Sequence, residues 1–189
     1  KSNRGSKSLV NKPTRITSFG QYVELFGGAP KTKFNLETDE SSPAGFKIGF
    51  VESTRFLMFD SMRLFYANGG ADCYIVSVGN YSEKIDATKL NDPSGGGLMS
   101  LEKNLEPTIL VVPEAILLSE PDCFSLQAAM LLHCGYKMKN RFAILDVFNG
   151  SKDRTFDEED VIDKFREGVG SNFLQWGAAY YPYLNAAVV

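Results

Sequence analysis

The fold is decided by the stretch Arg63-Leu64-Phe65-Tyr66-Ala67-Asn68-Gly69-Gly70-Ala71-Asp72-Cys73-Tyr74-Ile75-Val76-Ser77-Val78. Apolar side chains at Met58, Met62 and Phe65 recur at helical spacing and predict an amphipathic helix over residues 54–67. Asn68-Gly69-Gly70 tolerates positive φ angles, so the helix is expected to end there. The β-branched and aromatic residues that follow predict a buried strand over residues 73–78.

Helix and strand continue to alternate along the rest of the chain. Strands are predicted over residues 108–112, 141–147 and 176–184, and helices over residues 98–105 and 122–136. A further helix is predicted after a capping box of Thr155 and Glu158. The strands are apolar almost throughout, which is typical of a parallel sheet with helices on both faces. We therefore predict an α/β fold with three layers and a doubly wound, mostly parallel sheet.

The first part of the chain is predicted to be a small extension, residues 1–52, of a core domain over residues 53–189. It begins with a flexible entry over residues 1–13. Ser18 and Gln21 form a capping box for a short helix over residues 19–26. Residues 31–45 are rich in turn formers and predict a loop or hairpin, with an edge strand over residues 46–51. The chain starts without Met and stops in an apolar segment, so we expect it to be a piece of a longer protein.

Composition excludes several classes of protein. Hydrophobic residues make up 43% and charged residues 23% of the 189 residues, which is ordinary for a globular protein. The net charge of −3 gives no electrostatic footprint for nucleic acid or an anionic membrane. No apolar run approaches the ~20 residues of a membrane-spanning helix, and no signal peptide is visible. Cys123 and Cys134 would lie about 16 Å apart on one helix, too far for a disulfide, so we expect reduced thiols in a cytosolic setting.

Candidate chemical groups lie at the predicted carboxyl ends of strands, where doubly wound sheets bind their ligands. These are Ser77, Gly79, Glu114 and Asp146. No positioned base accompanies them, so we interpret them as turn residues and solvated carboxylates rather than catalytic groups.

Two further features have a functional and a structural interpretation. His133 is the only histidine and precedes Cys134, but adjacent helical residues point about 100° apart, which favours a packed or surface histidine over a metal ligand or base. Gly95-Gly96-Gly97 precedes a helix like a phosphate-binding loop. It lacks the lysine and hydroxyl residue of a P-loop, so we interpret it as a simple loop. No Gly-x-Ser-x-Gly elbow is present. We predict no catalytic residue, no cofactor and no metal.

The aromatic content is high, with fourteen phenylalanines and eight tyrosines. Most of them are expected in the core. Some, notably Phe46, Phe50 and the run Tyr180-Tyr181-Pro182-Tyr183, are candidates for contacts with neighbouring subunits, where aromatic side chains act as anchors.

Five motifs in series resemble one known family, the contractile tail sheath proteins. The residues are Pro13-Thr14-Arg15-Ile16-Thr17-Ser18-Phe19 with Phe26-Gly27-Gly28, Leu64-Phe65-Tyr66-Ala67-Asn68-Gly69-Gly70 with the strand after it, Leu110-Val111-Val112-Pro113-Glu114-Ala115, Arg141-Phe142-Ala143-Ile144-Leu145-Asp146, and Ala178-Ala179-Tyr180-Tyr181-Pro182-Tyr183-Leu184. Each motif is weak alone, and the series in this order is strong. The sequences of these motifs are most similar to those of sheath proteins from contractile injection systems and type VI secretion systems of Bacteroidetes.

The resemblance implies a structural role. Such sheath subunits stack as six-fold rings around an inner tube, and they contract in one event that drives the tube through a target envelope. Their central domain has a subtilisin-like fold without protease function. The residues with an implied structural role are Phe26, Gly27, Gly28, Asn68, Gly69, Gly70, Pro113, Asp146, Tyr181 and Pro182.

The same resemblance implies the partners and the location of the protein. The partners would be other sheath subunits, the inner tube protein, and baseplate and cap proteins, with no nucleic acid and no membrane insertion. The location would be the bacterial cytoplasm during assembly, and a phage tail or released particle afterwards. Judged against the family, we expect the N-terminal arm segment and the C-terminal domain to be missing from this chain. The alternative is a flavodoxin-like enzyme that binds a nucleotide or other small molecule, which rests on the predicted fold alone.

Overall fold

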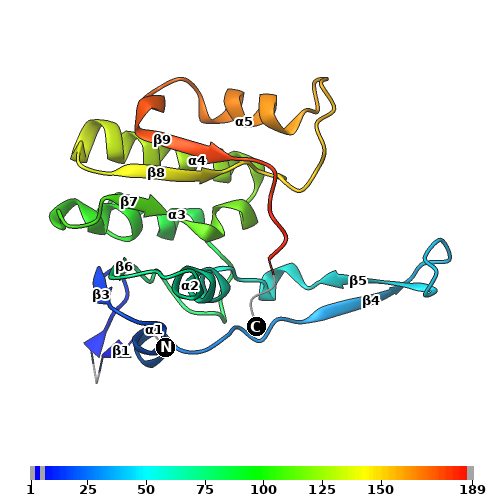
Figure 1. Ribbon diagram of the computed structural model, residues 1–189, viewed down its shortest axis with the longest axis horizontal. Helices are drawn as coiled ribbons and strands as arrows, with labels where there is room; N and C mark the ends of the chain where they lie inside the picture. The colour runs from blue at the N-terminus through cyan, green and yellow to red at the C-terminus, as the bar shows by residue number, and fades with distance from the viewer. Residues whose placement is uncertain (1–2, 5–6, 187–189) are drawn as a thin grey trace.

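The computed structural model describes residues 3–4 and 7–186 and mixes helices with small sheets (Figure 1). The strands are β1 (Asn3–Arg4), β2 (Lys7–Ser8), β3 (Thr14–Ile16), β4 (Phe34–Thr38), β5 (Phe46–Phe50), β6 (Cys73–Ile75), β7 (Ile109–Val111), β8 (Phe142–Asp146) and β9 (Gly177–Tyr180). The α-helices are α1 (Phe19–Phe26), α2 (Met58–Ala67), α3 (Ala87–Leu90), α4 (Glu120–Leu132) and α5 (Val161–Val169). Shorter 3₁₀ turns lie between them, and a π-helical turn, His133–Met138, extends α4.

A three-stranded parallel sheet forms the larger half of the molecule. Its strand order is β7-β8-β9, with Ile109 opposite Phe142 and Ala143 opposite Gly177. Crossovers between parallel strands are right-handed in nearly all proteins. Two successive crossovers in the same direction therefore place α4 and α5 on the same face, where they pack together.

That covered face holds the main hydrophobic core. Every second residue of β7 and β8 points into it, and the two helices supply the opposite side. The buried side chains are Leu110, Ala143 and Leu145 from the strands, Met130, Leu131 and Cys134 from α4 and its extension, and Phe165 and Val169 from α5.

The other face of the parallel sheet is open. Ile109 and Val111 on β7 are 62% and 50% exposed, and Tyr180 on β9 is 61% exposed. Because partners in the parallel register share a face, these residues, Phe142 and Asp146 lie on one largely apolar surface, which we call the open sheet face. In the described residues, α4 and α5 cover one face of this sheet, and the predicted helices on its second face are not confirmed.

Helix α2 packs in a separate cluster rather than on the open sheet face. Phe59 and Met62 of α2 are buried against Ile16, Tyr22 and Ile75 in a second hydrophobic cluster. β6 belongs to this cluster, because it pairs antiparallel with β3 rather than with the parallel sheet. The segment from residue 63 to residue 78 thus builds a small α/β layer of its own beside the parallel sheet (Figure 1).

Local signals placed α1 and the turn after α2 correctly. The Ser18 side chain accepts a hydrogen bond from the backbone N–H of Gln21, as the capping box predicts. Asn68 caps α2, and Gly69 takes a φ of 82°. A Cβ at Gly70 would lie 2.4 Å from the Phe65 ring, so only glycine allows the chain to return this tightly.

Other boundaries differ from the predictions. Residues 3–4 and 7–8 of the predicted flexible entry pair as β1 and β2, and the rest of residues 1–6 lies outside the described part. α2 starts at Met58 instead of residue 54, and α3 lies between the strand predicted over residues 73–78 and the helix predicted over residues 98–105, where no helix was expected. Asp160, not Thr155, caps α5.

The Asp160 carboxylate caps α5 in place of the predicted capping box, because it lies directly at the start of the helix. The Asp160 carboxylate accepts hydrogen bonds from the backbone N–H groups of Thr155, Phe156, Ile162 and Asp163. The Arg154 guanidinium also pairs with it, and this pairing, helped by the backbone hydrogen bonds, holds the pKa of the Asp160 carboxyl well below its usual range.

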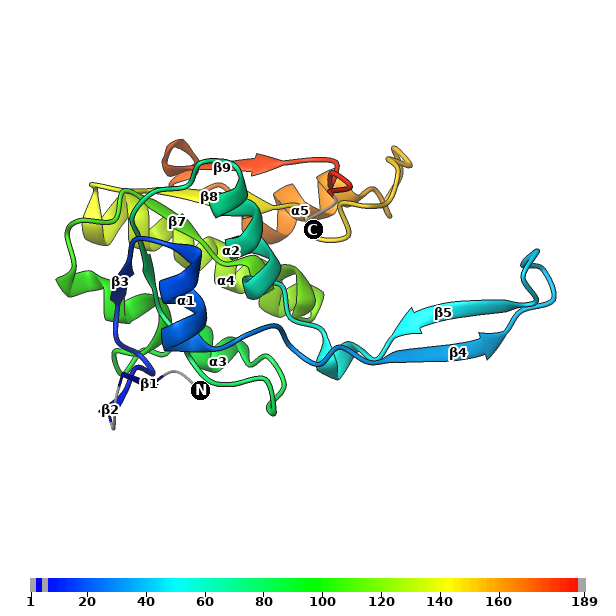
Figure 2. The ribbon, with the colours of Figure 1, turned by 60° about the horizontal axis from the view of Figure 1, so that its bottom comes forward.

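The predicted hairpin of the extension is present and projects from the body. β4 and β5 pair antiparallel over their full length, from Phe34 opposite Phe50 to Thr38 opposite Phe46. Both ribbon views show the hairpin reaching away from the sheets and helices (Figures 1 and 2). At its base, Lys33 N–H donates to the Thr54 hydroxyl at 2.9 Å.

Candidate functional site

The structure gives the candidate residues at strand ends structural partners. Ser77 lies beyond β6, beside the antiparallel pair, and its hydroxyl donates to the Gly79 carbonyl oxygen at 3.0 Å. Glu114 follows β7, and Asp146 ends β8. Glu114 and Asp146 therefore belong to the parallel sheet, whereas Ser77 and Gly79 follow a strand of the smaller sheet.

Glu114 caps a helix from outside. The first helical residue of α2, Met58, donates its backbone N–H to Glu114 Oε1 at 2.7 Å, and Leu57 offers no side-chain cap. A carboxylate at a helix N-terminus is favoured by the unpaired N–H groups there. Burial is the largest influence on this carboxyl and raises its pKa, against the backbone hydrogen bonds. Glu114 thus links the turn after β7 to α2, and it also lines the larger groove described below.

Asp146 lies in a small buried group at the end of β8. Gln127 Nε2 donates to the Asp146 carbonyl oxygen at 2.9 Å and to Cys123 Sγ at 3.1 Å. Burial raises the pKa of the Asp146 carboxyl, and it raises the pKa of the Cys123 thiol to about 11. The thiol is therefore protonated at neutral pH, which leaves it a poor nucleophile.

His133 is fully buried, in agreement with its interpretation as a packed histidine. Its Nε2 lies 3.3 Å from Nη1 of Arg141, which can only donate, so Nε2 is the acceptor and Nδ1 carries the proton. Burial and the Arg141 charge lower the His133 pKa to about 4. The neighbouring Cys134 is also buried, and burial raises its thiol pKa to about 11.

The glycine-rich loop is closed by packing. Gly97 has a φ of 51°, and a Cβ there would lie 2.2 Å from the Leu90 carbonyl oxygen. Its backbone N–H, which would have to face a phosphate, donates instead to Asn11 Oδ1 at 3.1 Å. These contacts support the interpretation of the segment as a loop.

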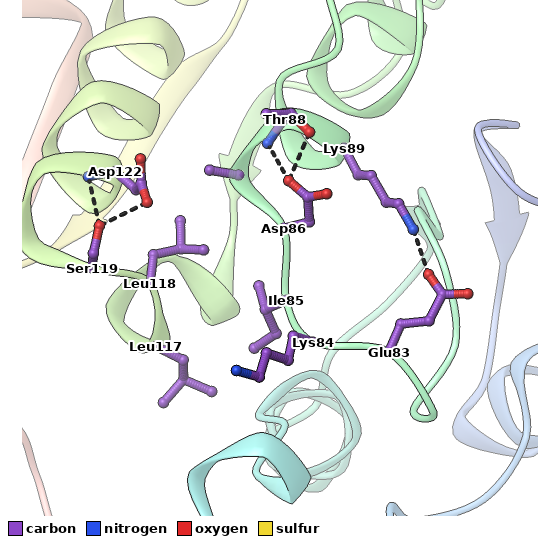
Figure 3. A pocket seen from close by; sticks show the side chains of 11 residues that line it. Glu83, Lys84, Ile85, Asp86, Thr88, Lys89, Leu117, Leu118, Ser119 and Asp122 are labelled. Carbon is purple, nitrogen blue, oxygen red and sulfur yellow. Dashed lines mark hydrogen bonds and ion pairs between the residues drawn. The ribbon is translucent and has the colours of Figure 1, made fainter.

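One polar hollow of about 500 Å³ lies between the segment 83–89 and the start of α4 (Figure 3). Most of its charged side chains already have partners. Lys89 pairs with Glu83, Asp86 caps α3 by accepting from Thr88, and Asp122 accepts from the Ser119 hydroxyl, which caps α4. The hollow therefore offers helix caps and an exposed ion pair rather than converging groups that could hold a ligand.

A larger groove of about 750 Å³ separates the two hydrophobic clusters. It is lined by α2, by residues 72–79 and by residues 106–114, so β6 and β7 border it on opposite sides. Apolar side chains such as Met62, Phe65 and Ile75 line it. Ile109 and Val111 also line it, so the groove adjoins the open sheet face.

The hairpin carries the most exposed apolar surface outside that groove. Cross-strand partners share a face, so one side of the hairpin holds only Thr38 besides apolar residues, and the opposite side holds Asn35, Glu37, Lys47 and Gly49. We call the first side the hairpin face. Its apolar members and their exposed fractions are Phe34 59%, Leu36 69%, Phe46 41%, Ile48 61% and Phe50 44%.

The sequence interpretation found part of this surface. It singled out Phe46, Phe50 and the tyrosine run, and the first two lie on the hairpin face. Tyr180 is exposed on the open sheet face, whereas the Tyr181 and Tyr183 hydroxyls donate to the carbonyl oxygens of Lys152 and Val147. We did not predict that Phe34, Leu36 and Ile48 are exposed on the same surface. The alternation of apolar and other residues in both strands could have indicated this.

The remaining residues of the sheath-like motifs lie at turns. Gly27, with a φ of 100°, ends α1 by donating its N–H to the Val23 carbonyl oxygen. The Phe26 ring stacks on Tyr22, with centroids 5.6 Å apart. Gly28 has open space around it, Pro113 begins the 3₁₀ turn Pro113–Leu117, and Pro182 follows Tyr181 through a cis peptide bond. These residues position elements, and Phe26 and Pro113 also line the groove of about 750 Å³.

In residues 3–4 and 7–186, no group of three or more His, Cys, Asp or Glu side chains is arranged to hold a metal ion. Over the same residues, no helix has both the length and the apolar character needed to span a bilayer. No protein-family model matches the chain, and neither does any curated protein.

Proposed function

We propose that the chain is a structural subunit of a contractile sheath, which polymerises around an inner tube and contracts to drive it through a target envelope. The observation that carries the proposal is the series of five sheath-like motifs, which spans residues 13–184 in the order of the family. A role without catalysis is part of the proposal. The partners we propose are further sheath subunits, the tube protein, and baseplate and cap proteins.

Packing of the motif residues supports a mechanical role. Glycines at positions 27, 69 and 70 end helices or allow a close return of the chain, and the Asn68 side chain donates to the Leu64 carbonyl oxygen at 2.8 Å. Such features fix the angles between elements and need no ligand. A subunit that moves as a rigid block during contraction requires this kind of local definition.

Unsatisfied apolar surface also supports an assembling protein. The hairpin face and the open sheet face both expose large apolar side chains. Contiguous apolar patches of this kind are rare on monomeric proteins and mark interaction sites. Contraction would release free energy by exchanging one set of such contacts for another between two states of the polymer.

Electron microscopy of the native gene product tests the proposal. With its tube partner present, it is expected to form tubes with a width on the order of 20 nm, an estimate from stacked domains of this size. Native protein that stays unpolymerised beside its tube partner would refute the sheath function.

The groove of about 750 Å³ is the observation that favours the second candidate, a small-molecule or nucleotide-binding protein. This candidate predicts a thermal shift of the chain with at least one member of a nucleotide and cofactor panel. A substitution that fills the groove, such as Ile109→Trp in its lining, is then expected to remove the shift. No shift across the panel refutes it.

A further inference from the structure

The β4–β5 hairpin leaves the apolar side chains of its hairpin face exposed to solvent. An isolated two-stranded hairpin is marginally stable in water, and it needs a third strand or a packed face for independent stability. Among residues 3–4 and 7–186, the hairpin is held at its base, where Val51 N–H donates to the Lys33 carbonyl oxygen and Arg55 lies over the Phe50 ring. Its apolar side chains remain between 41% and 69% exposed.

The amount of apolar surface matches that of a protein interface. Taking about 200 Å² for a whole aromatic side chain and slightly less for Leu or Ile, the exposed fractions leave about 500 Å² of apolar surface on the hairpin face. A standard interface buries about 800 Å² per partner, a little over half of it apolar. The hairpin face alone therefore supplies the apolar content of one side of a stable interface.

A matching surface lies on the same chain but out of reach. The open sheet face, with Ile109, Val111, Phe142 and Tyr180, exposes large apolar side chains over three strands and continues into the groove. A two-stranded face of five residues, about 17 Å long, is suited to sheet-on-sheet packing against it. Both views show the hairpin projecting away from this sheet, so the two surfaces of one molecule do not meet (Figures 1 and 2).

We propose that the β4–β5 hairpin is an intermolecular arm whose apolar face packs on the open sheet face of a second copy of this chain. The contact is heterologous, because two different surfaces meet. Each copy therefore keeps one free arm and one free sheet face, and the assembly grows without closing unless its rotation returns to the start. The choice of a second copy as the partner rests on the proposed sheath function. The inference adds to that function the two surfaces that meet.

Sedimentation analysis of the complete 189-residue chain and two single variants tests the contact. Ile48→Glu places a charge on the hairpin face, and Ile109→Glu places one on the open sheet face. Each is expected to weaken self-association by at least about 30-fold, the effect of losing one central anchor of about 2 kcal/mol. The matched control is Asn35→Glu, which adds the same charge to the polar side of the hairpin and is expected to associate like the wild type.

Mixing the two defective variants distinguishes the proposed contact from a symmetric one. Ile48→Glu keeps an intact sheet face and Ile109→Glu keeps an intact arm, so an equimolar mixture is expected to form a dimer that stops at two copies. If hairpins instead pair with each other, Ile109→Glu associates as strongly as the wild type, and the mixture associates no more strongly than expected from the two variants alone. That result overturns the inference. Thermal melts of both variants are expected to match the wild type, because the two substituted side chains are exposed.

The remaining outcomes separate this contact from the sheath function. If none of the three substitutions changes the strength of self-association, the proposed arm contact is refuted and the sheath proposal is unaffected. A chain that stays monomeric at high concentration also overturns the arm, and tubes of the native gene product would still support the sheath. Hairpin-dependent association without tubes refutes the sheath and supports the arm as a contact between copies.

Discussion

Protonation of His133 is expected to destabilise the fold as the pH falls from 7 to 5. The side chain is fully buried beside Arg141, and the nearest acid, Glu102, pairs with Lys137. Burial, and next the Arg141 charge, lower its pKa from 6.5 to about 4. A histidine with a lowered folded-state pKa contributes stability that is complete above the unfolded-state pKa and is lost as the pH falls towards the folded-state pKa.

The magnitude follows from the pKa difference. Each unit of pKa difference corresponds to about 1.4 kcal/mol, and the linkage relation gives a loss of about 2 kcal/mol in the free energy of unfolding between pH 7 and pH 5. Because the chain has one histidine, a His133→Gln variant removes the whole contribution. Glutamine can still accept a hydrogen bond from Arg141. Carboxylates titrate in both proteins, so their contribution cancels in the comparison.

Urea unfolding at pH 7, 6, 5.5 and 5 measures the effect, with the fluorescence of the single tryptophan, Trp176, as the signal. The wild type is expected to lose about 2 kcal/mol more than the variant over this range. Parallel pH dependences of the two proteins would refute the assignment of a buried, neutral His133.

Three other predictions concern packing, capping and thiol reactivity. Gly177→Ala is expected to cost about 1–3 kcal/mol in urea unfolding, because the added Cβ would lie 2.5 Å from a leucine of α4; an unchanged midpoint would contradict the packing of β9 on α4. Ser18→Ala is expected to lower the free energy of unfolding by about 1 kcal/mol through loss of the α1 cap, and Ser18→Thr should retain most of it. At pH 8 a thiol reagent is expected to label the half-buried Cys73 first, with Cys123 and Cys134 reacting only on unfolding; equal labelling rates of all three in the native protein would argue against this core.

Local signals in the sequence predicted elements better than pairings. The helix at Phe19–Phe26 and the return at Gly69 and Gly70 follow from residues adjacent in the chain, and these predictions are confirmed. The pairing of β6 with β3 depends on Arg15 and Tyr74 lying opposite each other, and no local pattern encodes that register.

The open sheet face accounts for the main difference between the predicted three layers and the structure. An apolar run such as Ile109–Val111 has the same sequence whether a helix of the same chain or a second molecule covers it. The alternation of exposed and buried residues in β7 emerges only from which face the crossover helices take. Likewise, the sequence could suggest aromatic contact residues but could not show that five apolar side chains share one side of a projecting hairpin.

The bond between Asn11 and Gly97 also has a consequence for synthesis of the protein. Its two residues lie 86 positions apart, and the ion pair of Arg15 with Asp72 spans 57 positions. At about 5–20 residues per second, a ribosome needs roughly 4–17 s to add 86 residues. For the first part of that interval, about 3–11 s for the 53 residues from Tyr22 to Ile75, α1 has no α2 or β6 to cover Tyr22, so this helix waits for its partners and is the segment a nascent-chain chaperone is expected to hold.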